Sequence, residues 1–272
     1  MIVAIQGQTG SFHDKARAKL FTQSNAMNCS SFSEVFDAVK SSRAEYGIVA
    51  IENSLYGSIN EVYSLLLDKK LWVVGEIYLH VSFALLGNKG AKLSDVTEVL
   101  SHPIALGECS QFLDETLSNA ERVNTDDTAK AAQIVKKNSK KTQAAVASSS
   151  VAELLDLDIL SENIENDQQN YTRFIIIQKD KQQPTAANKH SIILELAEKP
   201  GVLHEALGFF AERNINLTKI ESRPIPGKAW SYIFYLDFES SLDESRQVIA
   251  ELEKDGSKVT ILGSYTKANP LG

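Results

Sequence analysis

The chain has 272 residues, of which 43% are hydrophobic, so it has room for about two domains with substantial cores. Its 28 basic and 35 acidic residues give a net charge of −7 without a long basic run, which argues against nucleic acid or a membrane as a partner. Two cysteines, Cys29 and Cys109, are too few for a disulfide framework, which favours a cytoplasmic location. No stretch approaches the ~18 apolar residues of a membrane span. The strand-like start predicts no signal peptide, and the histidine spacing predicts no metal.

The first 79 residues predict strands that alternate with short helices. Strands are predicted at 2–6, 46–51 and 71–79, and helices at about 16–21, 34–41 and 59–68. We expect Thr9 or Ser11 to cap the first helix and Ser33 to cap the second. This order implies a largely parallel sheet, whose ligands collect beyond the carboxyl ends of the strands. The polar segments 7–11 and 52–54 follow two such ends.

A second α/β unit is predicted from about residue 82. Its strands are expected near 82–87, 96–100, 122–123 and 144–147. Helices are expected at 104–117 and 150–155, and a further helix is expected to end at residue 137. We expect Asp126 or Thr128 to cap the helix that ends at residue 137. Ser101 and the serines at 148–150 again stand where a strand gives way to a helix.

The apolar run 174–177 is typical of a strand that is buried on both faces, and Thr172 and Arg173 stand at its start. If this strand pairs in the first sheet, the chain crosses between two lobes near 78–82 and near 170–174. A hydroxyl donor and a planar guanidinium, both suited to a carboxylate, then lie between the lobes. The alternative is that Thr172 merely supplies a hydroxyl to a turn and that Arg173 is a solvated arginine at the start of the strand.

The polar segment 181–189 is predicted to be a linker. Beyond it we predict strands at 191–196, 216–220, 232–238 and 259–262, and helices from Pro200 and at 242–252. The order βαββαβ is that of a ferredoxin-like fold. Such a small α/β sandwich leaves one sheet face or edge free, so we expect a homodimer or homotetramer.

Several motifs resemble the prephenate dehydratase family. They are the segment 7–12, Glu52-Asn53-Ser54-Leu55-Tyr56-Gly57-Ser58, Ser101-His102-Pro103 and Asn170-Tyr171-Thr172-Arg173-Phe174. Two further motifs resemble the phenylalanine-binding signature of an ACT domain. They are Lys199-Pro200-Gly201-Val202-Leu203 and Glu221-Ser222-Arg223-Pro224.

The resemblance implies an α/β fold. A two-lobed catalytic domain like a type II periplasmic binding protein is expected at 1–180, and an ACT regulatory domain at 190–272. Lobe 1 would comprise 1–78 and 172–180, and lobe 2 would comprise 79–171. Because no chorismate mutase segment is evident, we expect the monofunctional form.

The implied reaction needs neither metal nor cofactor. Prephenate loses carbon dioxide and water to give phenylpyruvate, a step of phenylalanine biosynthesis, and L-phenylalanine inhibits the enzyme as an allosteric effector. Two alternatives stay open. One is an arogenate dehydratase, whose substrate carries an amino group in place of the keto group. The other is a non-catalytic module that binds a small acid.

For this chemistry Thr172 is the first candidate, as the donor to the departing hydroxyl oxygen. Arg173 would grip a substrate carboxylate, or else brace the lobes through a salt bridge. Asn53, Ser54 and Ser101 would hold the remaining oxygens as neutral donors, since tight ion pairing would stabilise the carboxylate that must leave as carbon dioxide.

Four further residues belong to the expected site. Thr9, Gly10 and Phe174 are assigned to substrate binding, although Phe174 also suits core packing. Glu108 stands where the family commonly has glutamine. A carboxylate facing a substrate with two carboxylates would repel it, so Glu108 is either protonated or points away.

Other polar residues have simpler interpretations. Glu52 most simply braces local backbone, and His102 caps or packs. The expected effector site is formed by Pro200, Gly201, Val202, Leu203, Glu221, Ser222, Arg223 and Pro224. Gly201 would allow the ligand close to the backbone at the start of a helix.

Overall fold

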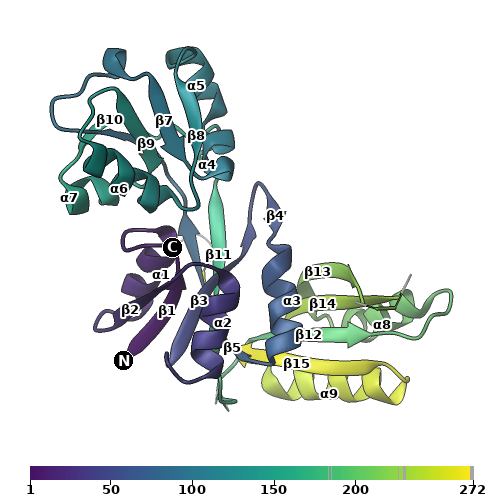
Figure 1. Ribbon diagram of the computed structural model, residues 1–272. Coiled ribbons are helices and arrows are strands. Elements are labelled where there is room, and N and C mark those ends of the chain that lie inside the picture. Colours follow the sequence, from purple (N-terminus) through teal and green to yellow (C-terminus); the bar gives the residue numbers. More distant parts are fainter. Residues whose placement is uncertain (183, 185, 226, 229–230, 270–272) are drawn as a thin grey trace.

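The computed structural model of the protein describes residues 1–182, 184, 186–225, 227–228 and 231–269. These residues form three sheets, each covered by helices. Figure 1 shows lobe 2 at the top, lobe 1 beneath it and the C-terminal domain beside lobe 1. None of the helices in these described ranges is both long and apolar enough to cross a membrane.

Lobe 1 is a mixed sheet in the order β2-β1-β3-β11-β5, with β4 paired to β3. Its strands are β1 (Ile2–Gln6), β2 (Asn25–Cys29), β3 (Tyr46–Asn53), β4 (Gly57–Ser58), β5 (Trp72–His80) and β11 (Tyr171–Gln178). Its helices are α1 (Phe12–Leu20), α2 (Phe32–Lys40) and α3 (Asn60–Lys69). β1 is parallel to β2 and β3, whereas β11 is antiparallel to β3 and β5 because it returns from lobe 2.

The helix caps of lobe 1 differ in part from the prediction. Ser11 caps α1, because its hydroxyl accepts a hydrogen bond from the Asp14 backbone N–H. The prediction that Ser33 caps α2 is wrong. Ser31 is the residue in extended conformation whose hydroxyl accepts from the Glu34 N–H, so the helix begins one residue before Ser33.

Lobe 2 is a sheet in the order β10-β6-β9-β7-β8. Its strands are β6 (Ala84–Gly87), β7 (Glu98–Ser101), β8 (Glu121–Asn124), β9 (Gln143–Ala147) and β10 (Asp158–Glu162). Its helices are the short η1 (Leu93–Asp95), α4 (Pro103–Glu108), α5 (Ser110–Thr116), α6 (Thr128–Asn138) and α7 (Ser150–Leu155). β2 and β10 are edge strands without a continuous buried apolar run, so the pattern does not predict them.

Two local predictions for lobe 2 are corrected. The predicted helix 104–117 is broken at Cys109, because Asn166 inserts there: its amide donates to the Gly107 carbonyl, and its Oδ1 accepts from the Gln111 N–H. Neither Asp126 nor Thr128 caps α6. Asp127 does, and its Oδ1 accepts from the Lys130 N–H at 2.9 Å.

The two lobes are joined by two chain crossings that lie side by side. β5 and β11 pair up to the His80–Tyr171 position, and beyond it the Val81 N–H donates to the Asn170 carbonyl at 2.7 Å. In Figure 1, β5 runs from lobe 1 toward lobe 2, and β11 returns beside it in the opposite direction. The motif at 170–174 therefore starts at the junction of the lobes.

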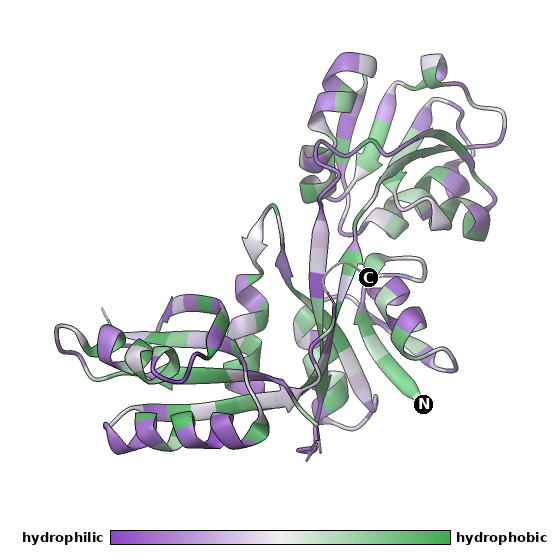
Figure 2. Cartoon of the chain, turned by 180° about the vertical axis from the view of Figure 1, so that it is seen from behind, coloured by the Kyte–Doolittle hydropathy of each residue, from purple (hydrophilic) through white to green (hydrophobic). Residues whose placement is uncertain are grey.

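The C-terminal domain is an antiparallel sheet in the order β13-β14-β12-β15. Its strands are β12 (Lys189–Glu195), β13 (Asn216–Pro224), β14 (Tyr232–Glu239) and β15 (Lys258–Tyr265), and its helices are α8 (Val202–Ala211) and α9 (Leu242–Lys254). Lys189, the last residue of the predicted linker, already belongs to β12. Figure 2 shows hydrophobic residues along β1 and alternating polarity on the outer helix α9.

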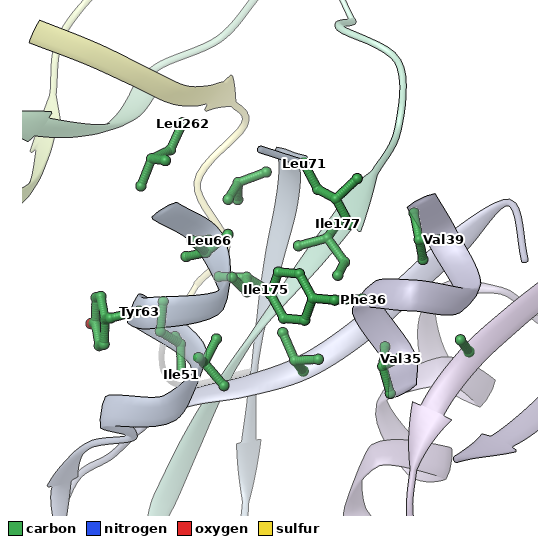
Figure 3. Packing of buried hydrophobic residues seen from close by; sticks show 14 of the residues in the cluster. Val35, Phe36, Val39, Ile51, Tyr63, Leu66, Leu71, Ile175, Ile177 and Leu262 are labelled. Carbon is green, nitrogen blue, oxygen red and sulfur yellow. The ribbon is translucent and has the colours of Figure 1, made fainter. Parts of the chain in front are cut away.

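The sheet face opposite α8 and α9 is not free, because it packs on lobe 1. Leu262 and Tyr235 belong to the same buried cluster as Tyr63, Leu66 and Val73 of lobe 1. Figure 3 shows Leu262 of β15 near Leu66 of α3. Because this one cluster contains residues of both domains, a continuous core joins them. Each large apolar side chain buried there contributes roughly 1.5–3 kcal/mol to stability. β13 remains an edge strand of its sheet.

Candidate active site

A cleft of about 510 Å³ lies between the two lobes. Lobe 1 contributes the start of α1, the β3–β4 turn and the side chains of Thr172 and Phe174 on β11. Lobe 2 contributes the start of α4, with Glu108 at its end, and the start of α6. The cleft thus lies beyond strand ends, where ligands bind in open α/β folds.

Thr172 is held in the cleft by a network of amide groups. Asn53 Nδ2 donates to Thr172 Oγ1 at 3.2 Å and to Asn170 Oδ1 at 2.7 Å. Asn53 Oδ1 accepts from the backbone N–H groups of Leu55 and Tyr56. Since the Thr172 oxygen accepts from Asn53, and no acceptor for its proton is found among the described residues, the hydroxyl is free to donate into the cleft.

Glu108 lines the same cleft and is only 5% exposed. Burial raises the pKa of Glu108 to about 7, and the negative charge of Glu165 adds to this while the amide of Asn170 opposes it. Among the described residues, Glu108 Oε1 and Asn170 Nδ2 have no hydrogen-bond partner. A neutral carboxyl group in the wall of a cavity can donate a proton to a ligand, although the unpaired Oε1 atom is itself buried.

The groups of the cleft that suit an anion are the N-termini of helices. Within the described part of the chain, none of its lining residues is lysine or arginine. The first turns of α1 and α6 do line it, through Phe12, His13 and Thr128. Helix N-termini carry unpaired N–H groups and a partial positive charge, which suit a carboxylate without a full ion pair.

The prediction that Arg173 grips a substrate carboxylate does not match its position. Arg173 is 4% exposed and turns away from the cleft, because successive side chains of a strand point to opposite faces. Its guanidinium donates to Glu76, Asp237 and Tyr265. The salt-bridge alternative describes it better, but the bridge joins lobe 1 to the C-terminal domain and not the two lobes.

Two serines that were expected to bind substrate oxygens bind backbone carbonyls instead. Ser101 is fully buried, and its hydroxyl donates to the Val146 carbonyl at 2.6 Å. Ser54 donates to the Gln169 carbonyl and accepts from the Tyr171 N–H, both at 2.9 Å. Ser101 therefore ties β7 to β9, and Ser54 ties the β3–β4 turn to β11.

The glycine-rich turn also differs from the prediction. Thr9 and Gly10 are not among the described residues that line the cleft. At Gly10, where φ is +90°, a Cβ atom would meet Val151 of lobe 2 at 3.1 Å, so this glycine lets the lobes approach. Phe174 is both core and cleft wall, with no exposed surface and an edge contact to His13.

Some functional residues were missed from the sequence. His13 lines the cleft, and its Nε2 accepts from the Ala50 N–H at 3.2 Å. Burial lowers the pKa of His13 to about 3, so the ring is neutral. Asp127 reaches across to lobe 1, where a Cβ atom at Gly7 would meet its Oδ2 at 2.5 Å. His102 caps α4, as its simpler interpretation has it.

The expected effector residues fall into two places. Pro200, Val202 and Leu203 line a pocket of about 460 Å³ at the start of α8, beside Gly201 with φ of +83°. Arg223 and Pro224 line another pocket of about 220 Å³, against α3 of lobe 1. Two other members of this group also lie on β13. They are Glu221, which accepts from Ser58 Oγ at 2.8 Å, and Ser222, which is exposed. Within the described part of one chain, the members of the two motifs that line a pocket line different ones.

Comparison with known proteins agrees with this architecture. Residues 3–182 match the family described as prephenate dehydratase, and residues 190–256 match the ACT domain family. Arogenate dehydratase 2 of Petunia hybrida is 38% identical over 281 residues, which cover 97% of this chain and 71% of the relative.

Two solved structures are similar over almost the whole chain. One, described as GqqA, a novel type of quorum quenching acylase, is 31% identical with a TM-score of 0.87, and the match covers 98% of each chain. The prephenate dehydratase of Arthrobacter aurescens in complex with L-Phe is 26% identical with a TM-score of 0.88, and the match covers 99% of this chain and 91% of that one. The chain belongs to the prephenate dehydratase family.

Proposed function

We propose that the cleft between the lobes converts prephenate to phenylpyruvate, with Thr172 and Glu108 as the groups that act on the leaving oxygen. Prephenate dianion takes up one proton and releases carbon dioxide and water, and the ring becomes aromatic. Aromatisation supplies the driving force, so the protein has to orient the substrate, exclude water and supply a donor.

Thr172 supplies the hydrogen bond. Its hydroxyl is too weak an acid to give up its proton outright, but it stabilises negative charge as that charge develops on the departing oxygen. The hydrogen bond from Asn53 fixes the Thr172 oxygen, which leaves the Thr172 proton directed elsewhere. Such a donor is worth most when it is already in position before the reaction.

Glu108 supplies the proton. With a pKa of about 7, about half of the Glu108 carboxyl groups are protonated in neutral solution and most are in mildly acidic solution, and the protonated form does not repel a dianionic substrate. As the carbon–oxygen bond breaks, the Glu108 proton passes to the hydroxide, which leaves as water. Asn170 is close to both groups, because its Oδ1 accepts from Asn53, which also donates to Thr172, and its amide lowers the pKa of Glu108.

The carboxylate that is lost needs only weak binding. Backbone N–H groups of the first turns of α1 and α6 hold an anion without the strong ion pair that a lysine or arginine would form. Weak binding suits a group that must lose its charge as carbon dioxide, since tight binding of the ground state would slow the reaction.

Arogenate is the second candidate substrate, and one observation favours it. Three carboxyl groups, those of Glu108, Asp126 and Asp127, line the cleft, and none of the other described lining residues is lysine or arginine. An ammonium group on the substrate would find a partner in an ionised carboxylate. Relative kcat/KM for prephenate and arogenate, measured on either side of pH 7, separates the two candidates.

Regulation and assembly complete the proposal. The 460 Å³ pocket beside Gly201 is the proposed site for L-phenylalanine, which is bound in the similar structure from Arthrobacter aurescens. The edge strand β13 supports pairing with a second copy, which would bring the exposed Ser222 and its neighbours toward a partner. We also propose the domain division 1–180, 181–189 and 190–272 and a cytoplasmic location.

The observation that carries the proposal is that Thr172 and Glu108 face one cavity between the lobes. Incubation of the protein with prephenate, followed by alkali, tests it through the absorbance of phenylpyruvate. Parallel incubation with arogenate, followed by detection of phenylalanine, tests the second candidate. Binding of either acid without turnover would favour the non-catalytic module.

A further inference from the structure

Directly behind Thr172, on the side away from the cleft, lies a buried group of charged side chains. Arg173 Nε donates to Glu76 Oε2 at 2.8 Å, Nη1 to Asp237 Oδ2 at 2.5 Å and Nη2 to the Tyr265 hydroxyl at 3.1 Å. Glu76 belongs to lobe 1, whereas Asp237 and Tyr265 belong to the ACT domain. The Arg173 side chain thus binds residues of both lobe 1 and the ACT domain.

Further side chains close this Arg173 cluster. Lys189 Nζ donates to both oxygens of Glu76, at 3.0 and 2.9 Å, and Ser191 Oγ donates to Asp237 Oδ1 at 2.5 Å. Two cations, Arg173 and Lys189, face two anions, Glu76 and Asp237, and all four residues are less than 9% exposed. Removal of one partner from such a buried group leaves an uncompensated charge, so the intact cluster stabilises the docked arrangement of lobe 1 and the ACT domain.

A second connection runs from the cleft to the ACT domain through Ser58. Ser58 lines the cleft. Its hydroxyl accepts from Lys219 Nζ at 2.7 Å and donates to Glu221 Oε2 at 2.8 Å, both on β13. Lys219 Nζ also donates to Glu52 Oε1, at 2.7 Å, and Glu52 lies 3.9 Å from Arg173. The two connections are therefore parts of one polar layer.

We propose that this layer, with Arg173 at its centre, sets the position of Thr172 according to how the ACT domain is docked. Arg173 is a positioning residue, because it touches the ACT domain and not the cleft. The inference rests on the proposed function, since it names the route by which an effector in the ACT domain would change catalysis at Thr172.

The route is short. Thr172 and Arg173 share a peptide bond, so a shift of the Arg173 side chain toward the ACT domain moves the Thr172 backbone. The hydrogen bond between Asn53 and Thr172 is long, at 3.2 Å, and a small displacement lengthens it further. Catalysis depends steeply on the placement of such a donor. A modest change in docking therefore changes the rate at the cleft.

Asp237→Asn in the full-length protein tests the proposal. The variant keeps the shape of the side chain and removes the charge that faces Arg173. We expect kcat to fall by about 3- to 10-fold with KM changed by less than about 2-fold, and inhibition by L-phenylalanine to weaken by at least about 10-fold. Calorimetric binding of L-phenylalanine without substrate should stay within about 2-fold of the wild type.

Glu239→Gln is the matched control. It changes a carboxylate to an amide on the same strand, but Glu239 pairs with Lys267, outside the cluster, so both kcat and inhibition should match the wild type. If Asp237→Asn fails to fold, Tyr265→Phe is the second variant, because it removes only the hydroxyl that binds Arg173. We expect the same fall in kcat and the same weakening of inhibition, each of smaller magnitude.

Two results are decisive against the proposal. Wild-type kcat together with wild-type inhibition in both Asp237→Asn and Tyr265→Phe would overturn it. If L-phenylalanine does not inhibit the wild type, the effector assignment fails, and the positioning role is judged on kcat alone. In that event a lowered kcat in Asp237→Asn with a normal control supports it, and an unchanged kcat overturns it.

Discussion

Thr172 and Arg173 are consecutive residues of β11, yet they bind partners in different domains. Thr172 Oγ1 lies 3.2 Å from Asn53 Nδ2 at the cleft between the lobes, whereas Arg173 Nη1 lies 2.5 Å from Asp237 Oδ2 of the ACT domain. Strand geometry produces this separation, since neighbouring side chains point to opposite faces. The strand that carries the proposed catalytic hydroxyl is thereby also the strand to which the ACT domain is docked.

The pH dependence of the reaction should report Glu108. If protonated Glu108 is the acid, kcat should fall as pH rises through about 7, its pKa in the folded protein. Glu108→Gln keeps a hydrogen-bond donor but cannot ionise, so its kcat should be lower in mild acid and lack this fall. Rates measured from about pH 5 to 9 compare the two profiles. A fall at the same pH in both proteins would remove Glu108 from the proton transfer.

The same residue should affect stability in a defined window. Because the pKa of Glu108 is raised in the folded state, from 4.5 to about 7, the folded protein holds the proton where the unfolded chain has lost it. The free energy of unfolding therefore decreases as pH rises between these two values. In urea unfolding, the stability of Glu108→Gln relative to the wild type should therefore be about 3 kcal/mol greater at pH 8 than at pH 4. A difference independent of pH would contradict the raised pKa.

Gly263→Ala should weaken the docking of the ACT domain. A Cβ atom at Gly263 of β15 would lie 1.9 Å from the Val73 carbonyl oxygen of β5, so the strands must separate. We expect a loss of roughly 2–4 kcal/mol in the free energy of unfolding. Gly208→Ala in α8 is the control, because nothing lies within 4 Å of its Cβ position, and it should gain about 0.5–1 kcal/mol. Equal stability of the two variants would mean that the strands are not in close contact.

Gly201→Val should relieve inhibition by L-phenylalanine while kcat stays unchanged. Gly201 has a φ of +83° at the start of α8, and a side chain there both strains the backbone and enters the space before the helix N-terminus. The control is Gly90→Val, which strains the backbone in the same way at a φ of +69° in lobe 2. Inhibition curves of the two variants are compared. Normal inhibition of Gly201→Val would place the effector elsewhere.

Much of the site was predictable because strand ends are visible in the sequence. The apolar run after Arg173 and the polar residues after residue 51 place Thr172 and Asn53 at one edge of the sheet, and the structure brings both into the cleft. Glu108 was predictable only through the family resemblance. Its raised pKa depends on burial, which no local pattern encodes.

The errors share a physical cause. A serine or an arginine at a strand end has many possible partners, and which one it binds depends on tertiary packing. The Ser101 hydroxyl binds the Val146 carbonyl, 45 residues away, and Arg173 binds Asp237, 64 residues away. Likewise the helix break at Cys109 depends on Asn166, which comes from a distant loop. Similarly, the sequence of the ACT domain alone does not show that one face of its sheet is covered, because lobe 1 supplies the covering residues.

The most direct test compares Thr172→Ala with Thr172→Ser in the turnover of prephenate. Thr172→Ala removes the donor and should lower kcat by ~10²-fold or more, while binding of L-phenylalanine stays intact. Thr172→Ser keeps the hydroxyl within reach of Asn53 and should retain kcat to within about 10-fold. Full activity of Thr172→Ala would contradict the account, because the leaving oxygen would then depart without that hydroxyl.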